Sequence, residues 1–348
     1  MPRLKLISLI LVLCAAMVCI AAPLSHDVRP GYGVTDVKWL SDYHQALKGT
    51  WGDTRVYILE GEEPGANVLL LSGTHTNEIA GIFTAMIFIE KIVVKKGKLI
   101  VVPWANNSAA TWGTVSYDNP ESKMTQPNYI TFTSQSGPRS VVVGSRRTNP
   151  LHQETDPATY THVSGVQFPG YESRNLDRVH PGRADGNLTE QISYALFELV
   201  RKEKIDMVVD LHEAGTSSRL ANMLVCNPKN LEMGAMAVLD LEFEDIQMKL
   251  EHSSEEFRGL SHREFGDHTD ALSFLIETPN PSQDQNVKQP YTLDHPKFPL
   301  WKRVYTHLRT FIVLCNYLDD FVGRGIVFEN IPESDAFESS AKFFMIYN

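Results

Sequence analysis

Three apolar runs in this sequence are each followed by residues that can bind a metal or carry a proton. The runs and their polar followers are 68–71 with His75 and Glu78, 205–211 with His212, and 271–276 with Glu277. Near-continuous apolar runs of this length are typical of strands buried on both faces by covering helices. Open α/β sheets bind ligands at the carboxyl ends of such strands. The sequence therefore predicts an α/β fold, a mixed parallel and antiparallel sheet flanked by helices, with a site at the strand ends.

His75 and Glu78 form an H-x-x-E pair where the first run meets a new helix. Zinc accepts both His nitrogen and Glu oxygen, and a catalytic site leaves one coordination position open. A second H-x-x-E, His252 and Glu255, lies in a polar stretch that resembles a solvated helix face. Because the spacing recurs there by chance, the spacing of the first pair is equally compatible with a metal ligand and with a structural His. Its place at a strand end is what favours the metal.

Residues 1–22 have the pattern of a secretory signal peptide. Arg3 and Lys5 precede sixteen apolar or small residues, 7–22. That run is shorter than the ~20 residues that span a bilayer, so we expect cleavage near Ala21 or Ala22 rather than an uncleaved anchor. The mature protein is then secreted or periplasmic, with no membrane contact beyond the signal peptide.

The composition, 43% apolar and 21% charged over 348 residues, is that of an ordinary globular protein. Loss of the signal peptide changes the formal net charge from −10 to −12. An acidic chain without a Lys/Arg run argues against a nucleic acid or an anionic membrane as partner. Cys226 and Cys315 remain, too few for a disulfide framework or a Cys-rich metal site. They form either one bridge or two buried free thiols.

Local patterns predict the other elements. A turn at residues 62–65 joins strands 54–60 and 67–72, a short connection that predicts an antiparallel pair. A helix from Glu78 to about Lys95 is expected to end at Gly97. The remaining elements are a strand over 98–103, a helix capped by Asn187 and Glu190, a strand over 222–226, helical segments over 232–256, and a closing helix over 301–321. No linker or repeat divides residues 34–348, which predicts a single catalytic domain.

Residues 104–186 are polar and lack a long period. Loops of such length are usually functional or disordered. Arginines in this stretch, among them Arg146, Arg147, Arg174 and Arg178, favour a functional role over a disordered insertion.

Two His and one Glu can supply the three protein ligands of a catalytic zinc site. Zinc lowers the pKa of a bound water to about 7, and a nearby carboxylate can take its proton. Glu277 is the candidate for that base. Arginine suits a developing oxyanion or a substrate carboxylate because its fork donates two parallel hydrogen bonds.

The order of these motifs resembles the zinc carboxypeptidase superfamily, and within it the succinylglutamate desuccinylase and aspartoacylase branch. The resemblance covers roughly residues 50–285. It rests on H-x-x-E at His75 and Glu78, the element Ser173-Arg174-Asn175-Leu176-Asp177-Arg178, Asp210-Leu211-His212, and Ile276-Glu277-Thr278. It implies a zinc carboxypeptidase-like fold and one zinc ion per chain, bound by His75, Glu78 and His212.

The resemblance also implies roles for the polar residues around the metal. Glu277 is implied as general base and acid, and Arg178 as the anchor of a substrate carboxylate. Arg146 is the favoured oxyanion arginine, with Arg147 and Arg174 as alternatives.

Two residues of these motifs each have two possible roles that the sequence does not distinguish. Asp210, two residues before His212, either orients that ligand or is structural. Asp177 stands where the family usually has Asn before Arg178. Asp177 either supports Arg178 or faces the substrate and binds an amine near its carboxylate, as in a diamino acid.

No Tyr occurs between Leu220 and Glu277, so the phenol that digestive carboxypeptidases place there is absent, which favours the deacylase branch. The first functional hypothesis is an exported zinc hydrolase that cleaves an amide bond of an N-acyl amino acid. The alternative is a metallocarboxypeptidase that acts on peptides, with cell-wall peptides as one class of substrate. The third is a non-catalytic metal-binding homologue, which has no need of Glu277.

Overall fold

The computed structural model describes residues 24, 26–113, 128–284 and 291–348. The predicted signal peptide therefore lies outside the described residues. At the centre is a nine-stranded sheet in the order β1-β2-β4-β3-β9-β12-β10-β11, with β13 also paired to β4. Its strands are β1 Asp36–Trp39, β2 Arg55–Glu60, β3 Glu63–Leu71, β4 Val93–Val102, β9 Met207–Ala214, β10 Met223–Cys226, β11 Lys249–His252, β12 Leu272–Pro279 and β13 Val327–Glu329.

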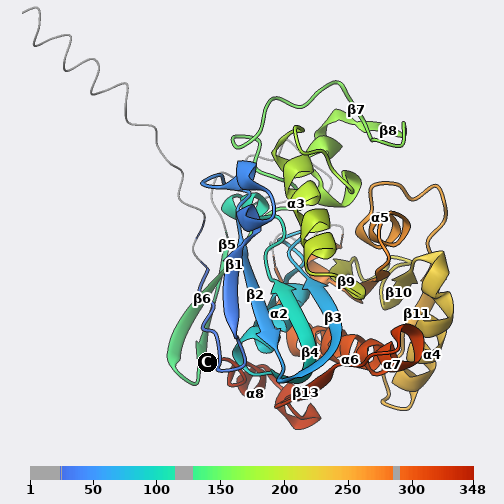
Figure 1. Ribbon diagram of the computed structural model, residues 1–348. Helices are drawn as coiled ribbons and strands as arrows, with labels where there is room; N and C mark the ends of the chain where they lie inside the picture. The colour runs from blue at the N-terminus through green and yellow to red at the C-terminus, as the bar shows by residue number, and fades with distance from the viewer. Residues whose placement is uncertain (1–23, 25, 114–127, 285–290) are drawn as a thin grey trace, which may run out of the picture.

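The middle of the sheet is parallel and its flanks contain antiparallel pairs. β4, β3, β9 and β12 run in parallel, whereas β2 pairs antiparallel with β4, and β10 pairs antiparallel with β12. Helices cover both faces (Figure 1). The predicted fold class, a mixed sheet flanked by helices, is therefore confirmed.

Alternate side chains of the central strands pack into two separate cores. Val68 and Leu70 pack with α2 Ile79–Glu90, α4 Leu231–Glu242 and α6 Leu300–Asn316 on one face. Leu69 and Leu71 of the same strand point to the other face, where they pack with α3 Leu188–Lys202 and α5 Ser261–His268. Because both faces are covered, β3 carries apolar residues at four consecutive positions, 68–71.

The predicted antiparallel pair of the first two runs is wrong. β2 and β3 are joined by a short connection, but β4 lies between them, antiparallel to β2 and parallel to β3. The predicted helix from Glu78 to Lys95 is too long, because α2 ends at Glu90 and Val93 already begins β4. The β-branched run 92–94 favours a strand.

Gly97, predicted as a helix end, lies within β4. Its φ is +83°, and a Cβ atom there would lie 2.6 Å from the carbonyl oxygen of Ala66 on β3. Glycine is therefore required at this position by the close approach of two strands.

In the carboxy-terminal half, several predicted elements are present, two are wrong in extent, and α5 and β13 were not predicted. Asn187 and Glu190 form the predicted capping box at the start of α3. The segment after α4 is not helical, because Asp245 has a φ of +59° and β11 follows it. The predicted closing helix is divided into α6 and the short α7 Leu318–Val322.

The irregular stretch predicted over 104–186 is ordered wherever the structure describes it. It contains two antiparallel hairpins and three 3-10 turns. These are β5 Asn128–Ser134 with β6 Gly137–Val143, β7 Thr159–Thr161 with β8 Gln167–Pro169, η3 Asn107–Thr111, η4 Gly170–Arg174 and η5 Leu176–Arg178. The interpretation as a disordered insertion does not hold for these residues.

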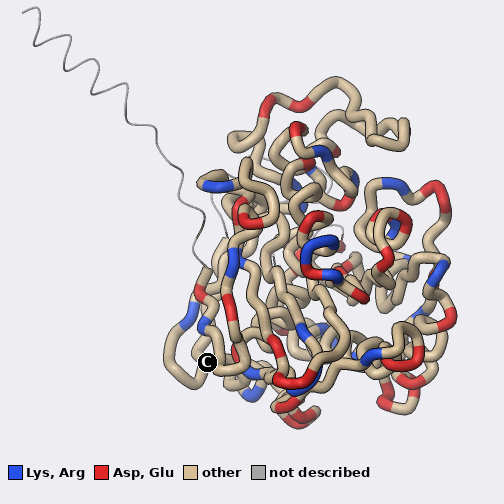
Figure 2. The backbone as a smooth tube through the Cα atoms, in the orientation of Figure 1, with Lys and Arg blue, Asp and Glu red and all other residues tan. Residues whose placement is uncertain are grey.

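Cys226 and Cys315 are both buried free thiols, which resolves the alternative that the sequence left open. Within the described ranges, no helix is long and apolar enough to cross a membrane. Acidic and basic residues are interspersed over the described elements (Figure 2).

We predict that the protein loses stability as the pH falls below about 6.5. Burial lowers the pKa of His180 and His262 to about 4 and of His307 to about 3, from an ordinary value of 6.5. The unfolded chain therefore binds more protons than the folded chain between these values. Each of these histidines should destabilise the fold by about 2 kcal/mol between pH 7 and pH 5.

Urea unfolding at pH 7, 6 and 5 measures this effect. The variant His307→Gln should lose part of the pH dependence, because it removes one of the histidines whose pKa burial lowers, a group that also includes His26 and His152. An unfolding free energy that stays constant from pH 7 to pH 5 would contradict the assignment of neutral, buried histidines.

Candidate metal centre

The corner after β3 places two of the predicted ligands. The chain turns at Gly73, whose φ is +62° and where a Cβ atom would lie 2.8 Å from the Pro103 carbonyl oxygen. His75 follows this turn, and Glu78 is the residue that precedes the first turn of α2. His212 lies on β9, the parallel neighbour of β3. The sheet therefore brings residues 75 and 212 to the same edge.

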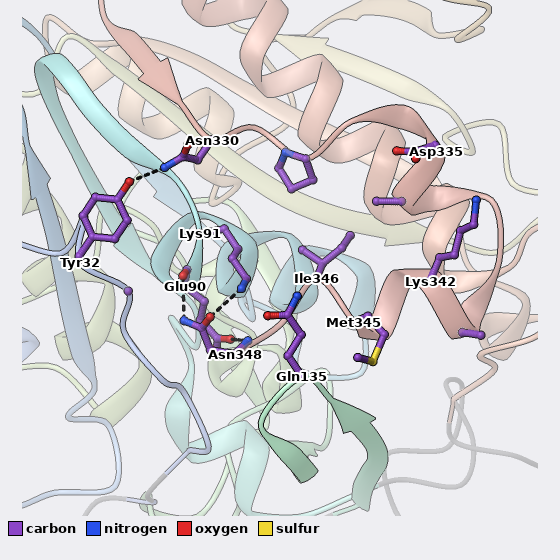
Figure 3. Close-up of a pocket in the computed structure, with 14 residues that line it drawn as sticks. Tyr32, Glu90, Lys91, Gln135, Asn330, Asp335, Lys342, Met345, Ile346 and Asn348 are labelled. Atoms are coloured by element: carbon purple, nitrogen blue, oxygen red, sulfur yellow. Dashed lines mark hydrogen bonds between the residues drawn. The ribbon is translucent and has the colours of Figure 1, made fainter.

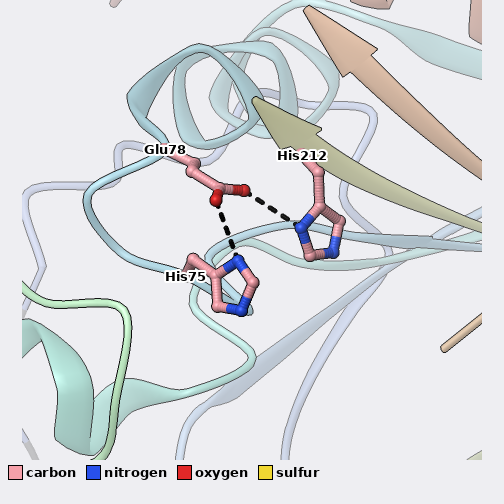
Figure 4. A group of neighbouring side chains, drawn as sticks. All are labelled: His75, Glu78 and His212. Carbon is pink, nitrogen blue, oxygen red and sulfur yellow. Dashed lines mark hydrogen bonds and ion pairs between the residues drawn. The ribbon is translucent and has the colours of Figure 1, made fainter. Parts of the chain in front are cut away.

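The three side chains converge as predicted (Figure 4). Nδ1 of His75 lies 2.9 Å from Oε1 of Glu78, and Nδ1 of His212 lies 3.0 Å from Oε2. Each side chain is at most 2% exposed. Their ligating atoms all lie within 4.8 Å of one another.

Hydrogen bonds at Nε2, the ring nitrogen of His75 that does not face Glu78, fix the orientation of the ring. Asn175 donates from Nδ2 to Glu172 Oε2 at 2.6 Å, so its Oδ1 faces His75 Nε2 at 2.9 Å. An amide oxygen only accepts, which assigns the ring proton to Nε2. The lone pair of Nδ1 is then directed at the metal centre.

Asp210 orients the ring of His212 in the same way. Its Oδ2 lies 2.9 Å from Nε2 of His212, and Thr74 Oγ1 donates to both of its oxygens at 3.1 and 3.2 Å. Metal-binding histidines commonly donate their other ring nitrogen to a carboxylate or carbonyl oxygen. The donor set, two Nδ1 atoms and one carboxylate with their outer partners, fits zinc.

The surroundings of Glu78 and Glu277 shift the pKa values of the two carboxyl groups in opposite directions. Burial raises the pKa of Glu78, but the charges of His75 and His212 outweigh it and hold that pKa well below its usual range. Burial raises the pKa of Glu277 well above its usual value, and the negative charge of Glu78 adds to the rise. Divergent pKa values of this kind separate a ligand from a proton carrier.

Glu277 lies beside the metal ligands because of strand register. β12 pairs with β9 in parallel, and Glu277 is the direct partner of His212. Its side chain is buried, and its Oε2 has no hydrogen-bond partner among the described residues. An acid with a free oxygen at this place is available to a substrate.

The predicted arginines lie at different distances from the centre. Arg146 Nη1 is 3.3 Å from Oε1 of Glu78. Arg147 pairs with Glu172 at 2.5 Å and stacks on the ring of Tyr171. The structure therefore pairs Arg146 with a predicted metal ligand, whereas Arg147 pairs with Glu172.

Arg174, the third arginine considered, is almost fully buried and pairs with Asp156 at 2.8 Å. It also donates to the Thr148 carbonyl oxygen at 3.0 Å, an arrangement that holds the surrounding loop together. Arg178 is the more exposed of the two and donates to the carbonyl oxygen of Asp177 at 2.6 Å. Substrate roles for these arginines stay predictions.

Sequence reasoning missed three residues that contact the ligands: Asn175, Glu213 and Gln283. Gln283 donates from Nε2 to Oε1 of Glu78 at 3.2 Å, and the backbone N–H of Glu213 donates to Oε2 at 3.0 Å. Asn175 was inside a recognised motif, but no pattern points to Gln283. Among the described residues, the second H-x-x-E is not part of any cluster of potential ligands.

A cavity of about 920 Å³ lies elsewhere in the structure (Figure 3). Glu90 and Lys91 on its wall lie at the carboxyl end of α2, whereas Glu78 lies at the amino end. Its polar side chains bond to one another, as Lys91 does to Asn348 and Asn330 to Tyr32. This cavity is therefore separate from the metal centre.

Comparison with protein-family models and with curated proteins gives no match. Three solved structures are similar in fold. The tripeptide-bound cell shape determinant Csd4 of Helicobacter pylori is 14% identical, with 80% of this chain and 57% of that chain covered and a TM-score of 0.49. An aspartoacylase family protein of Mesorhizobium loti is 18% identical, with 65% and 56% covered and a TM-score of 0.37. A succinylglutamate desuccinylase of Silicibacter is 13% identical, with 84% and 71% covered and a TM-score of 0.44.

This chain spans less than two thirds of the length of the first two structures. Csd4 is named a D,L-carboxypeptidase.

We predict that the protein holds one zinc ion per chain and that His75→Ala loses it. His252→Ala is the matched control, because His252 belongs to the other H-x-x-E and ends strand β11. Metal analysis of the purified variants after dialysis against zinc measures the difference. Loss of zinc in His252→Ala with retention in His75→Ala would show that the site is misassigned.

Proposed function

We propose that this protein is an exported zinc-dependent hydrolase that cleaves an amide bond in a small acyl-amino-acid or peptide substrate. The observation that carries the proposal is Glu277. It lies next to the predicted metal ligands with a raised pKa, and one of its oxygens has no hydrogen-bond partner in the described part of the chain. A site that only stores a metal needs no such group.

The roles of the residues follow from their positions. His75, Glu78 and His212 would hold the zinc, which when bound supplies Lewis-acid polarisation and an activated water. Glu277 takes a proton from the attacking water and returns it to the leaving amine. Arg146 donates to the oxyanion that develops on the substrate carbonyl, and Arg178 binds the substrate carboxylate.

Two substrate classes agree with this arrangement. An N-acyl amino acid and the carboxyl end of a peptide both present an amide bond next to a free carboxylate, which Arg178 can bind in either case. The absence of a Tyr between Leu220 and Glu277 favours the deacylase. The Csd4 structure contains a tripeptide, which is the reason to keep the carboxypeptidase as the second candidate.

Hydrolysis of paired substrates by the zinc-loaded mature protein tests the proposal. A panel of N-acetyl and N-succinyl amino acids is compared with dipeptides and tripeptides that end in the same residues. Turnover of the first set alone supports the deacylase, and turnover of the second set supports the carboxypeptidase. Zinc binding without turnover of either set would favour the non-catalytic homologue.

We predict that Glu277→Gln keeps the zinc and loses turnover by about 10²–10⁴-fold, because the amide preserves the shape but cannot accept the proton. In the wild type, kcat/KM should fall as the pH falls through the raised pKa of Glu277. This acid limb should be absent from any residual activity of the variant. Wild-type turnover in Glu277→Gln at full zinc content would exclude Glu277 as the proton carrier.

We also predict that Arg146→Ala lowers kcat by about 10²–10³-fold, as does the loss of an oxyanion donor in other hydrolases. Arg147→Ala is the comparison variant, because Arg147 is already paired with Glu172. Steady-state kinetics of both variants on one substrate measures the contrast. A larger loss of kcat in Arg147→Ala would transfer the oxyanion role to Arg147.

A further inference from the structure

The first turn of α2 is capped by a side chain from another element. Glu78 occupies the capping position just before Ile79, but its side chain makes no capping hydrogen bond. The backbone N–H of Ala80 donates instead to Oε2 of Glu213, on β9, at 3.0 Å. The first four N–H groups of a helix have no acceptor inside the helix. Glu213 therefore satisfies a donor that the residue before a helix normally satisfies.

This exchange leaves the carboxylate of Glu78 to the metal centre. The amino end of a helix attracts a carboxylate through its free N–H groups and its dipole. Here the carboxylate of Glu213 holds that place, and the two oxygens of Glu78 face Nδ1 of His75 and Nδ1 of His212 at 2.9 and 3.0 Å (Figure 4). The backbone N–H of Glu213 also donates to Oε2 of Glu78 at 3.0 Å. One residue thus supplies the cap and holds the carboxylate that the cap leaves free.

The start of α2 approaches β9 closely because residue 81 is a glycine. A Cβ atom at Gly81 would lie 2.9 Å from both the Cβ atom and the carbonyl oxygen of Leu211. Any other residue would push the first turn of α2 away from β9. Glu213 lies two residues beyond Leu211 on the same strand, so its side chain points to the same face of the sheet. The glycine therefore allows the contact between Glu213 and Ala80.

Two polar residues of α6, one turn apart, hold this region from behind. Arg303 donates from Nη1 to Oε1 of Glu213 at 2.5 Å. Nε2 of His307 lies 3.0 Å from Oγ1 of Thr278, which is the direct strand partner of Glu213 on β12. Thr278 donates to Oε1 of Glu213 at 3.4 Å, and Asn280 donates from Nδ2 to Oε2 at 3.2 Å. The carboxylate of Glu213 is thus fixed from several elements.

These contacts suit an ionised carboxylate. Glu213 is 2% exposed and Arg303 is 1% exposed. Burial raises the pKa of Glu213, and the charge of Arg303 opposes the rise. All four groups that contact the two oxygens are donors, and an ionised carboxylate only accepts. Each oxygen accepts from two of them, which leaves the side chain one orientation.

We propose that Glu213 is a positioning residue of the metal centre, which caps α2 in place of Glu78 and so keeps the Glu78 carboxylate directed at the metal. The proposal rests on the zinc hydrolase proposed above only through Glu78 as a ligand, and it is independent of the substrate. Residues that contact metal ligands from outside typically change metal affinity by about 10–100-fold when they are replaced. Glu213 acts in this way without touching the metal.

The zinc affinity of a double variant tests the proposal. Glu213→Leu alone leaves Arg303 buried without its partner, which is strongly destabilising. Glu213→Leu combined with Arg303→Leu replaces the ion pair by apolar side chains, a change that is often neutral for stability, but the cap remains lost. Competition with a chromophoric chelator should show about 10–100-fold weaker zinc binding. Wild-type zinc affinity in the folded double variant would overturn the proposal.

Glu213→Gln provides a second variant with a matched control. Its single acceptor oxygen faces Arg303, so its NH₂ group meets the N–H of Ala80 and the cap is lost. Glu90→Gln is the control, because Glu90 ends α2 and forms an equally buried pair with Arg139 at 2.8 Å. We expect Glu213→Gln to lose zinc affinity and Glu90→Gln to keep it, with urea unfolding to compare their stabilities. An equal loss in both variants would attribute the effect to the stability of α2 and overturn the proposal.

A crystal structure of the zinc-free double variant separates this proposal from the hydrolase function. Without Glu213, the carboxylate of Glu78 should turn toward the N–H groups of Ala80 and Gly81 and away from His212. A Glu78 carboxylate that stays between the two histidines would overturn the proposal, whether or not the wild type binds zinc. The turned carboxylate together with a wild type that binds no zinc would reject the hydrolase and still support Glu213 as the residue that orients Glu78.

Discussion

The buried carboxylate of Glu78 is the constraint around which this structure is built. An ionised carboxylate is costly to bury unless other groups compensate it, and Glu78 is only 1% exposed. Three groups donate to it, the Arg146 guanidinium, the Gln283 amide and the Glu213 backbone N–H, and the Nδ1 atoms of His75 and His212 lie beside it. These groups belong to segments that are far apart in the sequence, and the fold has to bring all of them to one point.

The order of the central strands satisfies this requirement. β3, β9 and β12 are parallel neighbours, so their carboxyl ends meet at one edge of the sheet. The same register that supplies His212 to Glu78 also places Glu277 directly beside His212. The carboxyl group of Glu78, a predicted ligand, therefore has a lowered pKa, while that of Glu277 has a raised pKa. The same chemical group is shifted in two directions, because Glu78 precedes α2 beside two histidines, whereas Glu277 lies on β12 near the charge of Glu78.

Sequence reasoning recovered the elements whose signal is local. The buried strands read from residues 205–211 and 271–276 are present, and the capping box at Asn187 forms because both of its residues lie within one turn. The errors concern pairing and length. A short connection indicates that two strands run in opposite directions, but not that they are adjacent, and β4 was inserted between β2 and β3. The end of α2 was missed because apolar residues continue through its boundary into β4.

By itself the sequence determined which residue types stand at the ends of the buried strands, and hence the chemistry of His75, Glu78, His212 and Glu277. Only the tertiary structure decided what surrounds them. Gln283 contacts Glu78 across 205 residues, and Asn175 contacts His75 across 100. The residue type at a strand end is a local property of the sequence. The hydrogen-bond partners of that residue depend on strand order and register, which are not local. That is why the ligands were read from the sequence, but the residues that orient them were not.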